Sequence, residues 1–152
     1  MYKWDRILHE DNVVVGLKST RKFDVIRELC GVLADDQAIV DHERFLADVI
    51  RREKHSSTGI GKGVAVPHVH EDIVRRQILA VGISRDGVDF GAADGQPVHI
   101  VALFASPQKH QKQHMELLAA LSRLLQQDEA RQLLVEAASP AEVVSIFATR
   151  GL

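Results

Sequence analysis

The chain has 152 residues, of which 45% are hydrophobic and 26% are charged, and its formal net charge is −2. This length and composition predict one soluble globular domain over residues 1–152, and the balanced charge excludes the basic surface that nucleic-acid binding requires. No stretch approaches the roughly 20 apolar residues of a membrane span, so no membrane insertion is expected. Trp4-Asp5-Arg6 near the start is unlike a signal peptide. The single cysteine, Cys30, is expected to be buried and cannot form an internal disulfide, so a reducing cytoplasm is the default location.

The first third of the chain predicts one strand and two helices. Residues 12–17 form a β-branched run that is typical of a strand. A helix is expected to follow, with Ser19 or Thr20 as its cap and apolar residues at helical spacing. A second helix is expected to begin after the cap residue Asp41 and to end near residue 54.

Residues 56–68, with the sequence SSTGIGKGVAVPH, combine a glycine-rich loop with a histidine. Three glycines alternate through the polar part of this segment: Gly59, Gly61 and Gly63. Such glycines let a backbone adopt positive φ and turn its N–H groups toward an anion. Residues 64–66 then predict a short buried strand that Pro67 ends, because proline has no N–H for the ladder. His68 is therefore expected at a strand end beside the loop.

The rest of the chain continues to alternate strands and helices. Strands are expected at 77–83 and 98–105, with turns at 84–87 and 94–97 between them. Helices are expected at about 110–126, 128–137 and 140–149, the last with Ser139 as its cap and Pro140 at its first position. The predicted fold is α/β, a three-layer α/β/α sandwich with a small mixed central sheet.

Two pairs among the eight histidines have spacings that bring imidazoles together. His68 and His70 share a face if strand geometry continues past the proline, and His110 and His114 share a face of a helix. Four imidazoles from a strand and a helix would suit zinc, so a metal site stays open as an alternative. No carboxylate or cysteine completes a known zinc pattern, so none is expected.

Two nucleotide-binding patterns do not fit the glycine loop. A phosphate loop of the Walker type needs serine or threonine after its lysine, whereas Gly63 follows Lys62. A dinucleotide fingerprint that starts at Gly59 needs a glycine where Val64 stands, and it opens a helix rather than a strand. No nucleotide and no other cofactor is therefore expected.

The segments that carry these residues resemble a known signature. The first segment contains Arg52-Glu53, then Ser57-Thr58-Gly59-Ile60-Gly61, and then Gly63-Val64-Ala65-Val66-Pro67-His68; the second is His114 followed by Leu117, Leu118 and Leu121. Their order is similar to the phosphorylation-site signature of the type-2 enzyme IIA domains of the bacterial phosphoenolpyruvate-dependent phosphotransferase system, in its fructose/mannitol and nitrogen-regulatory branches. Residues 87–90 and 94–98 resemble the hairpin region of that family, so the resemblance spans essentially the whole chain.

The resemblance implies that His68 is a nucleophile that accepts a phosphoryl group, with His114 as a second active-site histidine. The chemistry agrees, because a partly neutral imidazole is a nucleophile near pH 7 and phosphoryl transfer needs mainly positioning and charge neutralisation. Arg52 offers a permanently charged phosphate donor, and His114 is expected near the N-terminus of a helix, where the dipole favours anions. The loop glycines named above are expected to add backbone N–H groups.

By the same resemblance, the phosphoryl donor is the phosphohistidine of a small histidine-containing carrier protein. The acceptor is a cysteine of a IIB component, or the group stays on the chain as a regulatory mark. Because no IIB or IIC segment is attached to this sequence, a regulatory role of the nitrogen-branch kind is expected over sugar transport. One residue departs from the pattern: Val69 follows the histidine, where the family usually has Gly, Ala or Cys. This leaves a binding module without phosphotransfer as the alternative function.

Overall fold

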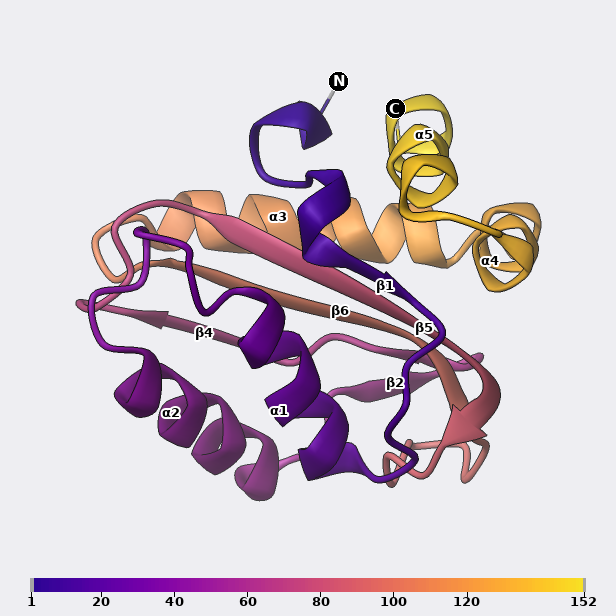
Figure 1. The fold of residues 1–152 in the computed structure, drawn as a ribbon, viewed down its shortest axis with the longest axis horizontal. Coiled ribbons are helices and arrows are strands. Elements are labelled where there is room, and N and C mark those ends of the chain that lie inside the picture. Colours follow the sequence, from indigo (N-terminus) through magenta and orange to yellow (C-terminus); the bar gives the residue numbers. More distant parts are fainter. Residues whose placement is uncertain (1, 152) are drawn as a thin grey trace.

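The computed structural model describes residues 2–151 as one layered α/β unit (Figure 1). Within these residues there are two short 3₁₀ helices, η1 (Trp4–Arg6) and η2 (Glu10–Asn12), and five α-helices: α1 (Lys22–Val32), α2 (His42–His55), α3 (Gln111–Leu125), α4 (Asp128–Glu136) and α5 (Pro140–Arg150). The same residues contain six strands: β1 (Val13–Val15), β2 (Gly59–Gly61), β3 (Val64–Ala65), β4 (His68–Glu71), β5 (Ile78–Val88) and β6 (Val98–Pro107).

The strands form one mixed sheet in the order β1-β5-β6-β3-β2. β5 and β6 are antiparallel and form the long centre, while β1 lies parallel to β5. The free edge of β6 carries two short parallel partners in succession: β3 pairs beside Ile100 and Val101, and β4 pairs beside residues 104–107. β4 therefore lies at an edge of the sheet, where helices from both faces can reach it.

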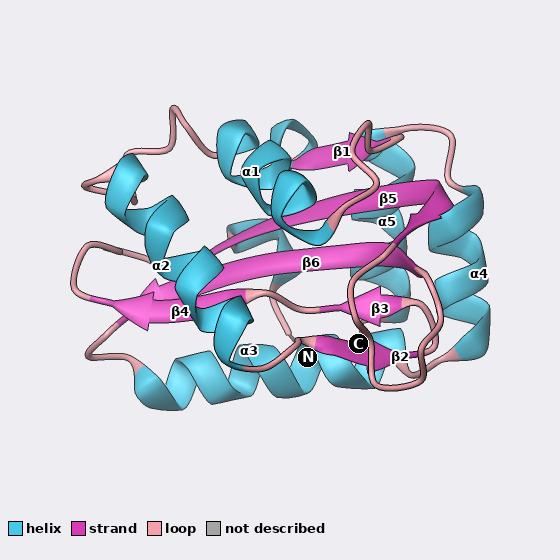
Figure 2. Cartoon of the chain, turned by 90° about the horizontal axis from the view of Figure 1, so that it is seen from below, coloured by secondary structure: helices cyan, strands magenta, loops and turns pink. Residues whose placement is uncertain are grey.

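Helices cover both faces of the sheet, so the predicted three-layer α/β/α sandwich is confirmed (Figures 1 and 2). α1 and α2 bury an apolar cluster on one face that includes Phe45 and Leu103. α3, α4 and α5 bury a second cluster on the other face that includes Phe104 and Phe147. The β5–β6 centre is apolar on both sides, as expected for strands that are covered twice.

Local signals located most helices and two of their caps. The Asp41 side chain accepts a hydrogen bond from the Arg44 N–H at the start of α2, and Ser139 does the same for the Glu142 N–H at the start of α5, as predicted. The predicted cap of the first helix was wrong. Arg21 occupies the N-cap of α1 without a side-chain hydrogen bond, and its extended backbone forms a bridge to Asp89.

One expected turn and part of the expected glycine-rich loop belong to strands instead. β5 continues through the predicted turn at 84–87 to Val88, with an irregular register in which Gly87 has a φ of +93°. The glycine-rich loop contains β2, which pairs antiparallel with β3. His68 does not end a strand, because strand pairing resumes directly after Pro67 and His68 is the first residue of β4. The turn residues thus mark a bulge and a tight hairpin within the sheet.

Across residues 2–151, the structure has no helix with the length and apolarity that crossing a membrane demands.

Candidate functional site

His68 lies at the sheet edge with one ring nitrogen anchored and the other free. Its ring stacks on Phe104 of the neighbouring β6, with centroids 4.9 Å apart. Its Nδ1 lies 2.6 Å from the Val66 carbonyl oxygen. Because a carbonyl oxygen only accepts, Nδ1 carries the proton in this contact, and the lone pair of the neutral ring is on Nε2. The structure therefore presents Nε2 of His68 as the nucleophilic atom.

The surroundings of His68 favour its neutral form. Burial lowers the pKa of His68, and the nearby charges of Arg52 and His70 lower it further, which outweighs the Val66 hydrogen bond and the Glu53 carboxylate. A nucleophilic imidazole must be neutral, so this shift suits attack by His68 at neutral pH.

His114 approaches His68 from helix α3, on the other side of β4 from α2. It lies in the first turn of α3, is only 3% exposed, and has its ring centroid 5.4 Å from that of His68. Its Nδ1 lies 2.7 Å from Ser106 Oγ, and its Nε2 is buried without a hydrogen-bond partner. Burial, followed by the charges of His68 and His70, lowers the pKa of His114 to about 4. The fold thus brings His114 next to His68.

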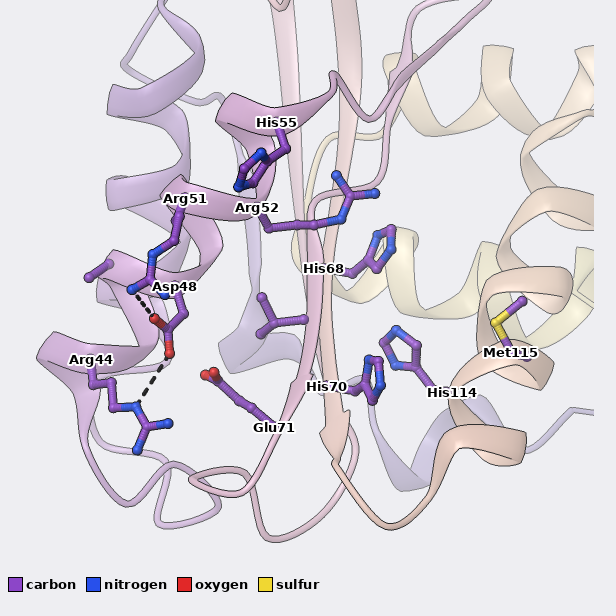
Figure 3. A pocket seen from close by; sticks show the side chains of 12 residues that line it. Arg44, Asp48, Arg51, Arg52, His55, His68, His70, Glu71, His114 and Met115 are labelled. Atoms are coloured by element: carbon purple, nitrogen blue, oxygen red, sulfur yellow. Dashed lines mark hydrogen bonds and ion pairs between the residues drawn. The ribbon is translucent and has the colours of Figure 1, made fainter.

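Arg52 extends from the last turn of α2 toward His68 (Figure 3). Its Nη1 donates to the Ser56 carbonyl oxygen at 3.2 Å, and within residues 2–151 it forms no salt bridge. An arginine without a carboxylate partner keeps its charge available for an anion. The structure therefore brings together His68, His114 and Arg52.

These side chains line one pocket of about 760 Å³ between α2, β4 and the start of α3 (Figure 3). Seven of the lining residues are arginine or histidine: Arg44, Arg51, Arg52, His55, His68, His70 and His114. Asp48 and Glu71 supply the carboxyl groups, and the arginines at 44 and 51 both pair with Asp48. Around His68 the pocket thus presents Arg52, which has no carboxylate partner, with His70 and His114, and this favours an anion there despite the nearby buried Glu53.

The predicted glycines lie outside this pocket. Gly61, Lys62 and Gly63 have φ values of +94°, +58° and +79°, and they form the tight turn between β2 and β3. The Lys62 N–H donates to the Asp94 carboxylate, in the connection between β5 and β6, and Lys62 does not line the pocket of His68. Gly59 approaches Ala92 so closely that a Cβ there would lie 2.8 Å from the Ala92 Cα. The geometry thus gives the three glycines a role in shaping this hairpin and its contacts, and it does not bring them to the pocket of His68.

Glu53 is an important residue that the sequence reasoning did not single out. Its side chain is completely buried, and it accepts hydrogen bonds from Thr58 N at 2.7 Å and Thr58 Oγ1 at 2.5 Å. Lys22 Nζ of α1 lies 3.4 Å from the same carboxylate. Glu53 thereby ties the end of α2, which carries Arg52, to the segment that leads to β2. Its place next to Arg52 in the motif was the available signal.

The four histidines that suggested zinc do not assemble. His70 lies beside His114, with ring centroids 4.9 Å apart, but His110 is exposed at the N-cap of α3 and does not line the pocket. No cluster of three or more potential ligands is arranged to hold a metal ion in the part of the chain that is described.

Val69 lines the same pocket, but its side chain lies on the opposite face of β4 from the His68 ring. Successive side chains of a strand alternate, and Val69 packs against the cluster beneath α1 and α2, whereas His68 stacks on Phe104 of the other cluster. Lys62 is the only residue other than glycine with positive φ among residues 2–151, so valine at 69 meets no such backbone demand. Its bulk is therefore accommodated without covering His68.

Comparison with known proteins agrees with this geometry. Residues 6–149 match the family described as "Phosphoenolpyruvate-dependent sugar phosphotransferase system, EIIA 2". The fructose-specific EIIABC component of Bacillus subtilis is 35% identical over 145 residues, which are 95% of this chain but only 23% of that protein. The fructose-specific EIIA component of Haloferax volcanii is 31% identical over 127 residues, covering 84% of this chain and 82% of that protein.

Among solved structures, the nitrogen regulatory protein IIA-Ntr of Neisseria meningitidis is similar over nearly the whole fold. The TM-score is 0.87 at 29% sequence identity, and the match covers 93% of this chain and 96% of that chain.

Proposed function

Since the chain belongs to the type-2 enzyme IIA family of the phosphoenolpyruvate-dependent sugar phosphotransferase system, a family of phosphoryl carriers, we propose that His68 is the residue that carries the phosphoryl group. The observation that supports this most directly is the anchored ring of His68. Its Nδ1–H is held by the Val66 carbonyl oxygen, so Nε2 is left as the nucleophile in a pocket with Arg52 and His114.

The proposed step exchanges one nitrogen–phosphorus bond for another. The lone pair of His68 Nε2 attacks the phosphorus of a phosphohistidine on the donor protein, and the donor imidazole leaves with the electron pair of the broken bond. Arg52 neutralises charge on the phosphoryl oxygens, and His114 contacts them from the side of α3. Such a step needs alignment and electrostatic support rather than a cofactor.

The proposed partners follow from the chemistry of the family. The donor is a small histidine-containing phosphocarrier protein, and the acceptor is a cysteine of a IIB component, unless the phosphoryl group serves as a regulatory mark that a target protein reads. We place the exchange in the cytoplasm, where the single buried cysteine stays reduced.

The test is to incubate the protein with phosphoenolpyruvate, enzyme I and the histidine-containing carrier protein, and to measure its intact mass. We expect an acid-labile gain of one phosphoryl group that is absent in His68→Ala and present in His9→Gln, which changes an exposed histidine outside the pocket. Adding a fructose-type IIB component then shows whether the group moves on to a cysteine.

Unmodified mass with several carrier proteins would overturn the proposal and favour a binding module that works by contact alone. Phosphorylation that persists in a folded His68→Ala protein would overturn the assignment of the residue. Circular dichroism of both variants shows whether they are folded.

A further inference from the structure

The proton position on His114 decides what this buried residue can do for an anion. A neutral imidazole has one N–H donor and one acceptor nitrogen. If the proton is on Nε2, His114 offers a donor to a phosphoryl oxygen, whereas a lone pair on Nε2 would repel it. Burial and the two neighbouring imidazoles lower the pKa of His114 to about 4, so the ring has a single proton at neutral pH. What holds this proton on one nitrogen must lie on the Nδ1 side.

Gln77, just before β5, has an amide whose orientation is determined by a backbone group. Its Nε2 lies 3.1 Å from the carbonyl oxygen of Gln113 and 3.0 Å from Ser106 Oγ. A carbonyl oxygen only accepts, so the amide must present its NH₂ group to this side. The second N–H of that group is then donated to Ser106 Oγ. Tyr2 Oη lies 3.5 Å from the amide oxygen on the other side, which agrees with this orientation.

Ser106, on β6, passes this polarity to His114. Ser106 is completely buried, and within residues 2–151 its hydroxyl has two hydrogen-bond partners, Gln77 Nε2 and His114 Nδ1. Since Gln77 is a donor, Ser106 Oγ accepts from it and needs an acceptor for its own proton. The lone pair of His114 Nδ1, 2.7 Å away, is that acceptor. The opposite tautomer would leave a buried hydroxyl proton without a partner, which is unfavourable.

We propose that Gln77 and Ser106 form a hydrogen-bond relay that holds His114 as the Nε2–H tautomer, so that His114 donates to the phosphoryl group. The donation by His114 rests on the proposed function of His68, because it needs a phosphoryl group there. The relay itself exists without phosphorylation. It also explains why His114 Nε2 is buried without a partner, because its acceptor is present only when the phosphoryl group is bound. Gln77 and Ser106 act through His114, so they are positioning residues.

The direct test is a two-bond ¹H–¹⁵N correlation spectrum of the unphosphorylated protein at neutral pH, which distinguishes the two tautomers of each histidine. The wild-type protein is expected to show His114 with its proton on Nε2. Ser106→Ala removes the hydroxyl donor and should give a mixture of tautomers. Gln77→Glu should give the reverse tautomer, because a carboxylate would accept the Ser106 proton and turn the hydroxyl oxygen toward an Nδ1–H. Gln96→Glu adds the same charge at an exposed position and should leave the spectrum unchanged.

The rate of phosphorylation supplies the second measurement. Removal of a preorganised donor from a reacting oxyanion commonly lowers a rate by about 10²–10³, so the reverse tautomer in Gln77→Glu should lower the rate by about that factor. The mixed tautomers of Ser106→Ala keep part of the donor form, so the rate there should fall by only about twofold.

A wild-type spectrum with the His114 proton on Nδ1, or an unchanged tautomer in folded Gln77→Glu, would overturn the relay. Absence of phosphorylation on wild-type His68 would instead overturn the proposed function while leaving the tautomer result intact, so the two failures are distinguishable. If Ser106→Ala does not fold, Gln77→Glu alone decides the question.

Discussion

At the scale of single residues, the pocket holds groups whose protonation differs from that in the unfolded chain. The pKa of His114 is about 4 in the folded protein, against 6.5 as an ordinary value. The folded state therefore binds fewer protons than the unfolded state between these values. The stability that belongs to neutral His114 is fully present above pH 6.5 and is lost as the pH falls toward 4.

This linkage predicts how stability depends on pH. Between pH 7 and pH 5, His114 should cost the wild-type protein about 2 kcal/mol of unfolding free energy. His114→Gln has no titrating group at this position. From pH 7 to pH 5, its unfolding free energy should therefore decrease by about 2 kcal/mol less than that of the wild type. Urea denaturation of both proteins at the two pH values measures the difference. Parallel losses in the two proteins would show that His114 does not titrate in this way.

Glu71 shifts in the opposite direction. Burial, followed by the nearby carboxylate of Asp48, raises the pKa of Glu71 to about 8. One oxygen of Glu71 is buried without a hydrogen-bond partner, which agrees with an unfavourable place for a charge. The stability that belongs to protonated Glu71 is fully present below pH 4.5 and is lost as the pH rises through 8.

Glu71→Gln should therefore stabilise the protein at high pH. At pH 9 the variant is expected to melt at a higher temperature than the wild type, and the difference should shrink near pH 6, where Glu71 is protonated. Thermal unfolding followed by circular dichroism measures it. Glu10→Gln, at an exposed position in η2, serves as the control and should show no comparable gain at pH 9.

The sequence predicted better which motif residues meet in the pocket than which side chains surround them. His68, Arg52 and His114 lie in recognisable motifs, so their approach could be inferred without coordinates. The pairing of Asp48 with Glu71 depends on how α2 packs against β4, and no spacing along the chain contains that information.

At the scale of elements, two successive residues at the end of α2 point to different places, one into the pocket and one into the interior. Arg52 extends into the pocket, while the next residue, Glu53, is buried between α1 and the segment before β2. Glu53 accepts two hydrogen bonds from Thr58, which is also buried. The conformation of this connection therefore depends on one carboxylate.

Removal of that carboxylate should destabilise the protein strongly. Glu53→Ala leaves Lys22 and the Thr58 donors without their partner, a kind of loss that commonly costs about 3–5 kcal/mol. The comparison is Glu43→Ala, an exposed glutamate in the first turn of the same helix, where the expected loss is only about 0.3–1 kcal/mol from the helix dipole. Chemical denaturation of both variants measures the difference, and equal losses would contradict the role given to Glu53.

Elements whose boundaries are set by local chemistry were predicted well. The caps Asp41 and Ser139 satisfy N–H groups within three residues, so sequence alone located them. β4 was missed because it forms only by pairing with β6, more than 30 residues away along the chain, and the proline before it suggested a strand end. In the neighbouring hairpin β3 was predicted as a strand, whereas β2 was missed because its alternating glycines indicated a loop.

At the scale of the whole molecule, residues near both ends of the chain close one layer together. Trp4 is buried in η1, its ring lies edge-on against Phe147 of α5 at 5.1 Å, and its Nε1 donates to the Gly151 carbonyl oxygen at 2.9 Å. A side chain at position 151 has no room, because its Cβ would collide with the Trp4 ring. η1 and α5 thus complete the apolar cluster on the α3 side of the sheet.

This closure predicts a graded effect of substitutions at Trp4. Trp4→Ala should cost about 3–5 kcal/mol, as is common for buried aromatic residues, while Trp4→Phe should cost less because it keeps a ring against Phe147 and loses mainly the hydrogen bond. Urea denaturation followed by far-ultraviolet circular dichroism compares the two variants with the wild type. Equal unfolding midpoints in all three proteins would show that the contact adds nothing to stability.

The contact between Trp4 and Gly151 also has a consequence for synthesis on the ribosome. Its partners are separated by 147 positions, so the N-terminal turn has no docking site until the last helix has emerged. α1, α2 and the central strands can pair while translation continues, yet the apolar face under η1 must wait until α5 is made. Because Trp4 is the only tryptophan in the chain, its fluorescence reports when this final step of assembly has taken place.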